Sequence, residues 1–450
     1  MSELIERARE IEKTLDLEKL ARAGFINDIR SKAQSHHTVT YPEQEATQLV
    51  NSDDIFRNQT QKNLALYFHV PFCTGKCVYC HYVSSPAPPE RVKRYLSALE
   101  KEIELVSELP GIRDSKVTSA YIGGGTPTYL SPEQLKHLIS VIRARFDLQP
   151  GAEISVEASP ETLLGALGEE RLDVIKEYIG RLNTGRLSIG VQTFNDDILA
   201  AMKRRHSHSQ TLEALENARK RFPNFNIDLM MGLPGQTLGV WENDIQLATL
   251  ARTPSITTYP LKIKPQVAVW KIFQKHPEQF SDRRDVLLMH IMAIEHFEQD
   301  SFLNYKENPV WWFTASHEFV HKHQMHKWGD NGELIGLGVS AYSYVNGWQY
   351  YNFSDTGEYM ASLERGELRI SRGAKLSLQE QTKRAIIFGL KCADIDKQGF
   401  ARRYGFFPEE RFGKNLGRLE KLGLVDTDKH RIRLTYTGRL FSEEVARSFI

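Results

Sequence analysis

The sequence predicts an α/β protein: a partial or full (β/α) barrel, a helical N-terminal extension and a small C-terminal α+β domain of winged-helix-like form. Three observations lead to this prediction. From residue 64 onwards, short runs of β-branched and aromatic residues alternate with amphipathic helices, a pattern typical of βαβ units and a parallel sheet. Polar and glycine positions interrupt this pattern where the predicted strands end. Residues 376–450 change to helices followed by a short hairpin.

Composition limits the possible classes of protein. At 450 residues the chain exceeds one ordinary domain, and its 41% apolar and 26% charged content is that of a globular protein. A net charge of +1 gives no electrostatic reason to expect nucleic acid or an anionic membrane as partner. We see no apolar run of about 18 residues, no secretory signal and no disulfide framework. We therefore expect a cytoplasmic protein that binds neither nucleic acid nor membrane.

Changes of pattern along the chain divide it into four parts. Apolar positions at helical spacing over residues 3–33 predict one or two amphipathic helices, and residues 34–62 read as a polar connector. The predicted parts are an N-terminal helical extension (1–62), the barrel core (63–300), a substrate-side connecting region (301–375) and the C-terminal winged-helix-like domain (376–450).

The repeating unit gives six predicted strands and two long helices between the first three of them. The strands are predicted over 64–70, 117–122, 154–157, 187–192, 227–230 and 256–263. Helices are predicted over 91–109 and 130–146, the second with Ser131 as N-cap and Pro132 at its first position. In a (β/α) barrel the chemistry lies at the carboxyl ends of the strands, so loops and side chains at those ends are the candidate site.

The loop after the first strand holds three of the four cysteines: Cys73, Cys77 and Cys80. Pro71 ends the strand because proline cannot donate to a ladder. Iron–sulfur clusters usually take four thiolates and structural zinc four closed ligands, yet Cys392 lies far along the chain. Three ligands and an open position indicate a metal centre that binds substrate. Zinc with His81 as fourth ligand is the alternative, disfavoured because Cys80 and His81 are adjacent.

The CxxxCxxC loop preceded by His-Val-Pro-Phe resembles the radical S-adenosylmethionine (radical SAM) superfamily, and within it the oxygen-independent coproporphyrinogen III oxidase-like (HemN-like) family. The resemblance implies that Cys73, Cys77 and Cys80 hold a 4Fe–4S cluster whose open iron chelates SAM. It also implies a small-molecule substrate and a reductant such as flavodoxin or ferredoxin.

Several residues at the strand ends match SAM-binding positions of that family. Gly123 to Pro127 follow the second strand and lack the Lys-Ser/Thr of a P-loop, so they fit a close backbone approach to another ligand. Glu157 suits an ammonium, Asp228 a ribose hydroxyl pair and Arg204 a carboxylate. The full implied set is Tyr67, Tyr79, Gly124, Gly125, Thr126, Glu157, Gln192, Arg204, Asp228, Pro260 and Tyr342. The family implies a second SAM near Gly125, Gln192 and Tyr342.

Residues 317–326 contain four histidines, including an i,i+4 pair that could place two imidazoles on one helix face. Residues 317–321 read His-Glu-Phe-Val-His and so match the letters of His-Glu-x-x-His, but such short motif matches readily mislead. We therefore expect a polar segment that lines the substrate side of a cavity, in preference to a metal site.

The reaction is the least determined feature. In the porphyrin enzymes of this family a fourth cysteine stands two residues after the third, where this chain has Tyr82, and the haem-chaperone relatives lack its long N-terminal extension. These departures favour methylation or cyclopropanation of an sp2 carbon through a second SAM. Oxidative decarboxylation of the coproporphyrinogen III dehydrogenase type is one alternative. A non-catalytic haem chaperone, with the histidines of 317–326 as haem ligands, is the other.

Overall fold

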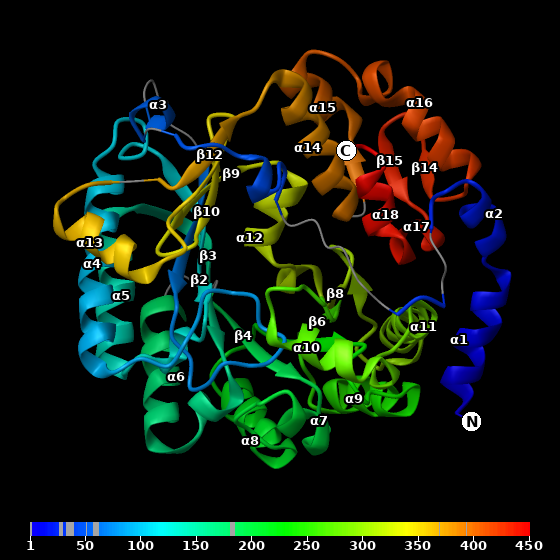
Figure 1. Cartoon of the computed structure of the whole chain (residues 1–450), viewed down its shortest axis with the longest axis horizontal. Helices are drawn as coiled ribbons and strands as arrows, with labels where there is room; N and C mark the ends of the chain where they lie inside the picture. Colours follow the sequence, from blue (N-terminus) through cyan, green and yellow to red (C-terminus); the bar gives the residue numbers. More distant parts are fainter. Residues whose placement is uncertain are drawn as a thin grey trace.

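A computed structural model of the chain describes residues 2–26, 30–32, 40–50, 52–56, 63–180, 185–368, 370–392 and 394–450. Its centre is a large sheet whose first six strands are parallel and follow one another in chain order (Figure 1). The strands are β1 (Asn63–Val70), β2 (Lys116–Gly124), β3 (Asp147–Ala158), β4 (Gly185–Gln192), β5 (Phe225–Met231) and β6 (Ser255–Pro260). Neighbours in sequence are therefore neighbours in space, as βαβ units require.

The sheet continues beyond these six strands at both sides. On one side β9 (Glu333–Leu337) pairs parallel with β1, and it leads to β10 (Tyr342–Val345), β11 (Trp348–Tyr351) and β12 (Arg372–Lys375). On the other side β8 (Trp312–Thr314) pairs antiparallel with β6 and with β7 (Lys306–Glu307). In the described chain the sheet thus ends at β12 and β7, so the barrel is partial.

Helices cover the outer face of the parallel strands (Figure 1). Their apolar stripes, for example Leu99 and Ile103 on α4, pack against the outward-facing strand residues in one continuous core. These helices are α4 (Pro89–Ser107), α5 (Pro132–Arg145), α6 (Gly165–Gly180), α7 (Asp196–Ala201), α8 (His208–Arg219) and α9 (Leu238–Leu250), with short 3₁₀ turns η2 (Pro127–Tyr129) and η3 (Pro160–Leu163).

The predicted N-cap of α5 is confirmed, whereas two strands have other bounds than predicted. Ser131 caps α5 as expected: its hydroxyl accepts from Gln134 N at 3.2 Å, and the Gln134 side chain accepts from Ser131 N at 3.0 Å. The sixth strand ends at Pro260, three residues earlier than predicted. The third begins at Asp147, seven residues before its predicted start, because its first half pairs with the start of β2.

The connecting region and the N-terminal segment lie against this barrel. The end of the predicted barrel core contains α10 (Ala268–Lys275), η4 (Pro277–Gln279), α11 (Arg283–Ile294) and η5 (Glu295–Asp300). Besides strands β7 to β12, the connecting region contains η6 (His317–Phe319), α12 (Lys322–Gln324), η7 (Met325–Gly329) and α13 (Thr356–Glu364). The N-terminal segment contains α1 (Glu3–Thr14), α2 (Leu17–Arg22), η1 (Gln44–Ala46) and α3 (Ser52–Phe56). Glu12 of α1 accepts two hydrogen bonds from Arg284 of α11, at 2.6 and 2.7 Å. Residues 34–39, 51 and 57–62 of the predicted connector lie outside the described residues.

The C-terminal residues form helices around a small antiparallel sheet of order β13-β15-β14. Its elements are α14 (Leu378–Lys391), β13 (Asp394–Asp396), α15 (Lys397–Tyr404), α16 (Pro408–Lys421), β14 (Val425–Thr427), β15 (Arg431–Leu434), α17 (Tyr436–Leu440) and α18 (Ser442–Arg447). Arg439 joins this unit to the barrel side through Glu298 at 2.8 Å and Glu307 at 3.0 Å. Among the described helices, none has the length and apolarity needed to cross a bilayer.

Candidate radical SAM site

The cysteine loop begins directly after β1, at one end of the parallel strands. Cys73, Cys77 and Cys80 are free thiols and are partly exposed, whereas Cys392 is buried at the end of α14. A different residue donates to each loop sulfur: Thr126 Oγ1 at 3.5 Å from Cys73, Arg204 Nη1 at 3.5 Å from Cys77, and Lys76 Nζ at 3.7 Å from Cys80. The Ser84 hydroxyl also lies 3.8 Å from Cys80 Sγ, and two of the donors, Arg204 and Lys76, carry a positive charge toward the loop.

The sequence left two metal centres open for this loop, an iron–sulfur cluster and a zinc ion. Burial raises the pKa of the Cys73 thiol, and the neighbouring Cys80 and Cys77 raise it further, which places the three sulfurs within electrostatic reach of one another. His81 stacks on Tyr82 with ring centroids 4.4 Å apart. In the part of the chain that the structure describes, no three His, Cys, Asp or Glu side chains form a single-ion site. Three thiolates on one short loop fit a cluster that leaves one iron open.

The glycines after β2 join the cysteine loop to the sheet. Gly125 N donates to Val70 O at 2.8 Å and Thr126 N donates to Phe72 O at 2.7 Å. A Cβ on Gly125 would lie 2.6 Å from Phe72 O, and one on Gly123 would lie 2.8 Å from the Glu157 carboxyl carbon. Glycine is therefore required here for the loop and for the approach of Glu157, as well as for any ligand.

Glu157 and Asp228 are the acidic groups beside this loop. Glu157 accepts from Gly124 N at 2.9 Å and from Tyr121 Oη at 2.6 Å. Burial, with Asp228 nearby, raises the pKa of Glu157 to about 7. Burial likewise raises the pKa of Asp228 to about 6, although Asn226 donates to it at 2.9 Å. A carboxylate with a raised pKa favours a cationic ligand that restores its charge balance.

Gln192 ends β4 in a conformation that few non-glycine residues adopt, with φ of +74°. The register between β4 and β5 shifts at this point, as in a β-bulge, which turns the side chain toward the site. Its Oε1 accepts from Tyr259 Oη of β6 at 2.7 Å. Backbone conformations of this kind are common at ligand-binding sites, and Gln192 is one of the predicted SAM residues.

Arg204 connects three parts of the site. Its Nη2 donates to Ser159 Oγ at 2.9 Å and to Gly190 O, while Nη1 reaches Cys77 and, at 3.5 Å, Tyr79 Oη. Its Nε is buried without a hydrogen-bond partner in the described chain. The family resemblance implied that Arg204 binds the carboxylate of SAM; within the protein its partners are the cysteine loop, Ser159 after β3 and Gly190 of β4.

The other predicted residues occupy different parts of the rim. Tyr67 Oη shares a hydrogen bond of 2.9 Å with His69 Nδ1, and Tyr67 is within electrostatic reach of Glu157, Tyr82 and Tyr342. The Tyr342 hydroxyl is buried and has no hydrogen-bond partner among described residues, so it is an available donor. Pro260 ends β6 and also lines an 820 Å³ cavity between α11 and the C-terminal helices.

Comparison with known proteins agrees with this geometry. The Radical SAM superfamily model matches residues 67–248, and the HemN C-terminal domain model matches residues 376–441. The heme chaperone HemW of Bacillus subtilis is 31% identical over 389 residues, covering 85% of this chain and 98% of that protein. The chain belongs to the radical SAM superfamily and, within it, to the HemN-like family.

Other members of the family match over similar lengths. The oxygen-independent coproporphyrinogen III oxidase of Escherichia coli is 28% identical over 412 residues, which is 86% of each chain. The solved structure of coproporphyrinogen III oxidase (HemN) from Escherichia coli covers 93% of this chain and 99% of its own, with a TM-score of 0.77 and 24% identity. Membership implies a 4Fe–4S cluster and SAM as cofactors, and the three free thiols, the glycine cradle and the available Arg204 Nε and Tyr342 hydroxyl fit them.

The sequence predictions did not include four residues that contact the predicted site residues or lie near them: Tyr121, Arg186, Glu161 and His206. Tyr121 and Arg186 lie inside the barrel, and Glu161 and His206 lie beside Arg204. Burial alone would raise the pKa of Glu161, but the His206 hydrogen bond and the Arg204 charge hold it at about 2. Strict alternation along β2 would have pointed Tyr121 to the same face as Gly123, so that signal was present in the sequence.

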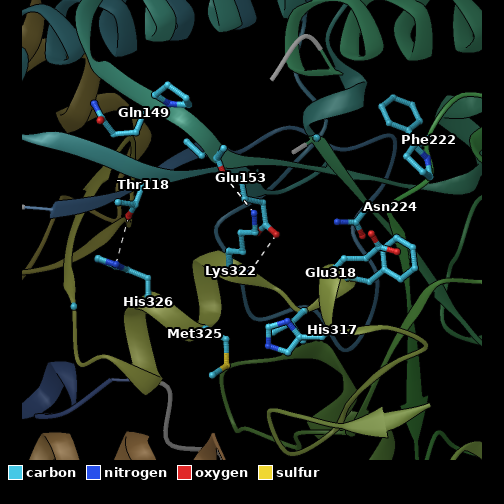
Figure 2. Close-up of a pocket in the computed structure, with 18 of the residues that line it drawn as sticks. Thr118, Gln149, Glu153, Phe222, Asn224, His317, Glu318, Lys322, Met325 and His326 are labelled. Carbon is cyan, nitrogen blue, oxygen red and sulfur yellow. Dashed lines mark hydrogen bonds between the residues drawn. The ribbon is translucent and has the colours of Figure 1, made fainter. Parts of the chain in front are cut away.

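The histidine segment lies at the opposite end of the barrel. It lies at the amino ends of the strands and lines a cavity of about 2120 Å³. Figure 2 shows His317, Lys322, Met325 and His326 around this cavity. His321 and His323 are buried further in, with ring centroids 5.5 and 5.4 Å from that of Tyr121. The segment is thus cavity-lining, on the face of the barrel away from the cysteine loop.

Proposed function

We propose that this chain is a radical SAM enzyme whose substrate is a haem-related tetrapyrrole, with oxidative decarboxylation of a coproporphyrinogen as the best-supported reaction. The main support is a set of four polar side chains near the cysteine loop: Glu157, Gln192, Arg204 and Tyr342. The relatives that match most of the chain are named for coproporphyrinogen or heme. These relatives lend no support to methylation or cyclopropanation.

The protein's own share in such a reaction is binding and orientation. Cys73, Cys77 and Cys80 would hold the 4Fe–4S cluster, which, when bound and reduced, would supply with SAM the radical chemistry that removes a hydrogen atom. Glu157 would accept from the SAM ammonium, and Asp228 from its ribose hydroxyls. The buried Tyr342 hydroxyl and Arg204 Nε remain to donate to SAM oxygens. Removal of one hydrogen atom from a propionate side chain, loss of CO₂ and passage of one electron to an external acceptor then leave a vinyl group.

The test is anaerobic turnover with chemically distinct products. Reconstituted protein, SAM, a flavodoxin-type reductant and coproporphyrinogen III should give 5′-deoxyadenosine, CO₂ and vinyl-bearing product together. Cys77→Ala should abolish all three, whereas Cys392→Ala, the matched cysteine buried in α14, should keep the cluster. Appearance of S-adenosylhomocysteine in step with 5′-deoxyadenosine would instead favour methylation and refute decarboxylation.

A second candidate, haem binding, is favoured by the cavity in Figure 2. His317, His326 and Met325 line it, and histidine and methionine are common axial ligands of haem iron. The relatives named heme chaperone make the same chemistry plausible for this chain. Titration of the protein with hemin should then give a sharp Soret band that shifts in His317→Ala or Met325→Leu. A stoichiometric band unchanged in both variants would exclude this cavity as the haem site.

A further inference from the structure

The interior of the barrel is lined by polar side chains from four neighbouring strands. Alternate residues of one strand face the same side, so the register identifies the inward set. The hydrogen bonds agree: Asn226 donates to Ser188 at 3.1 Å and to Asp228 at 2.9 Å, while Ser255 donates to Asn226 at 2.9 Å. The inward set is Glu153, Ser155 and Glu157 of β3, Arg186 and Ser188 of β4, Asn226 and Asp228 of β5, and Ser255 and Thr257 of β6.

Arg186 occupies a central place in this set. It pairs in register with Ser155, which lies midway between Glu153 and Glu157 on β3. Two residues along a strand and one strand across correspond to a backbone separation of about 8 Å from Arg186 to each glutamate. Asp228 approaches from the other side, because it pairs with Gly190 further along β4. One cation therefore stands among three acids.

Burial makes this arrangement electrostatically necessary. Arg186 is 1% exposed, and its Nη2 donates to Ser255 Oγ at 3.3 Å, while its Nε has no hydrogen-bond partner in the described residues. A buried charge without opposite charge nearby is strongly destabilising. Arg186 in turn lowers the pKa of Glu153, Glu157 and Asp228, each of which burial raises.

We infer that Arg186 is a positioning residue: it is the shared counterion of the barrel interior that keeps Glu157 and Asp228 ionised and directed toward SAM. The inference rests on the proposed SAM contacts of these two acids. Arg186 itself lies below them, toward the amino ends of the strands, and reaches SAM only through them. The other charged or titratable groups that face Glu157 are Tyr121 of β2, Tyr67 of β1 and Tyr82 of the cysteine loop. Asp228 also faces Arg204, Tyr259 and Tyr82. His321 and His323 face Arg186 from the amino end of the barrel.

The experiment measures SAM affinity against pH by equilibrium dialysis of the reconstituted holoprotein, without substrate. A unit charge about 8 Å away changes a carboxyl pKa by roughly 1.5 units at an effective dielectric constant of about 20. For Arg186→Gln we expect SAM binding at least about tenfold weaker at pH 7 and a midpoint shifted upward by about 1–1.5 pH units, so that affinity recovers above about pH 9. Arg186→Lys, which keeps the charge, should stay close to the parent profile.

A second variant tests the same inference from the other direction. Glu153→Gln removes an acid that shares the Arg186 charge, while its amide oxygen can still accept from one of the two backbone donors, Lys322 N (now 3.1 Å from Oε2) or His323 N (now 3.2 Å from Oε1). We expect its midpoint to move to lower pH. A uniform loss of affinity at every pH in Arg186→Gln, or an unchanged midpoint in Glu153→Gln, would overturn the inference. Neither outcome depends on which tetrapyrrole reacts, so failure of the proposed reaction would be seen separately.

Discussion

Replacing Gly124 with alanine should damage the site far more than a glycine-to-alanine change elsewhere. Gly124 has φ of +108°, and a Cβ there would lie 2.6 Å from Cε1 and Nδ1 of His69. The imidazole cannot shift freely, because its nitrogens bond Tyr67 Oη and Val83 O, each at 2.9 Å. The same residue donates its N–H to Glu157 at 2.9 Å. Backbone displacement at Gly124 would therefore move a proposed SAM ligand.

The magnitude follows from two separate costs. A non-glycine residue at positive φ costs about 1–3 kcal/mol. Loss of a buried hydrogen bond of His69 adds about 1–3 kcal/mol, so we expect Gly124→Ala to lower the free energy of unfolding by about 2–6 kcal/mol. Gly151 is the matched control: its φ is +83°, but a Cβ there meets nothing within 4 Å. Gly151→Ala should show the first cost alone.

The assays are urea unfolding of both variants and SAM binding to their reconstituted forms. We expect Gly124→Ala to be the less stable variant and to bind SAM at least about tenfold more weakly, since even 1.4 kcal/mol corresponds to tenfold. Gly151→Ala should bind SAM as the parent does. Equal losses of stability in the two variants, with SAM affinity intact in both, would refute the packing argument for Gly124.

Three further predictions concern charge. Burial raises the pKa of Glu157 to about 7, while an unfolded glutamate titrates near 4.5, so ionisation of Glu157 opposes folding above about pH 5. Glu157→Gln should therefore stabilise the SAM-free protein by about 1–3 kcal/mol at pH 8 but little at pH 4, as thermal melts would show, and should abolish SAM binding at pH 8 in dialysis. Lys391 is buried and paired with Glu443, so Lys391→Met should cost about 3–5 kcal/mol in urea unfolding, and adding Glu443→Met should restore much of that loss. Arg204→Lys keeps the charge but not the forked contacts to Cys77 and Gly190, so a chelator should remove iron from it faster than from the parent; equal rates would show that these contacts do not protect the cluster.

Local pattern was sufficient for the barrel and for the loop that begins its chemistry. β-Branched strands, amphipathic helices and the Ser131 cap are decided by neighbours a few residues apart, so β1 to β6 were predicted in the right order. Short elements were not predicted, because a few residues give too weak a sequence pattern. The predictions omitted β13 of the C-terminal unit and the N-terminal half of β3, because these segments pair with β15 and with the start of β2, which lie elsewhere in the chain.

The sequence alone determined that three cysteines follow the first strand, and that glycines and acids follow the next ones. Only the tertiary structure decided how these residues support one another. Arg204 reaches Cys77 across 127 residues, and Lys322 and His323 reach Glu153 across about 170. The physical reason is that a buried charge takes its partner from whatever the fold brings near, and sequence spacing does not encode that proximity. The central position of Arg186 among three acids follows from strand register, which exists only in the folded sheet.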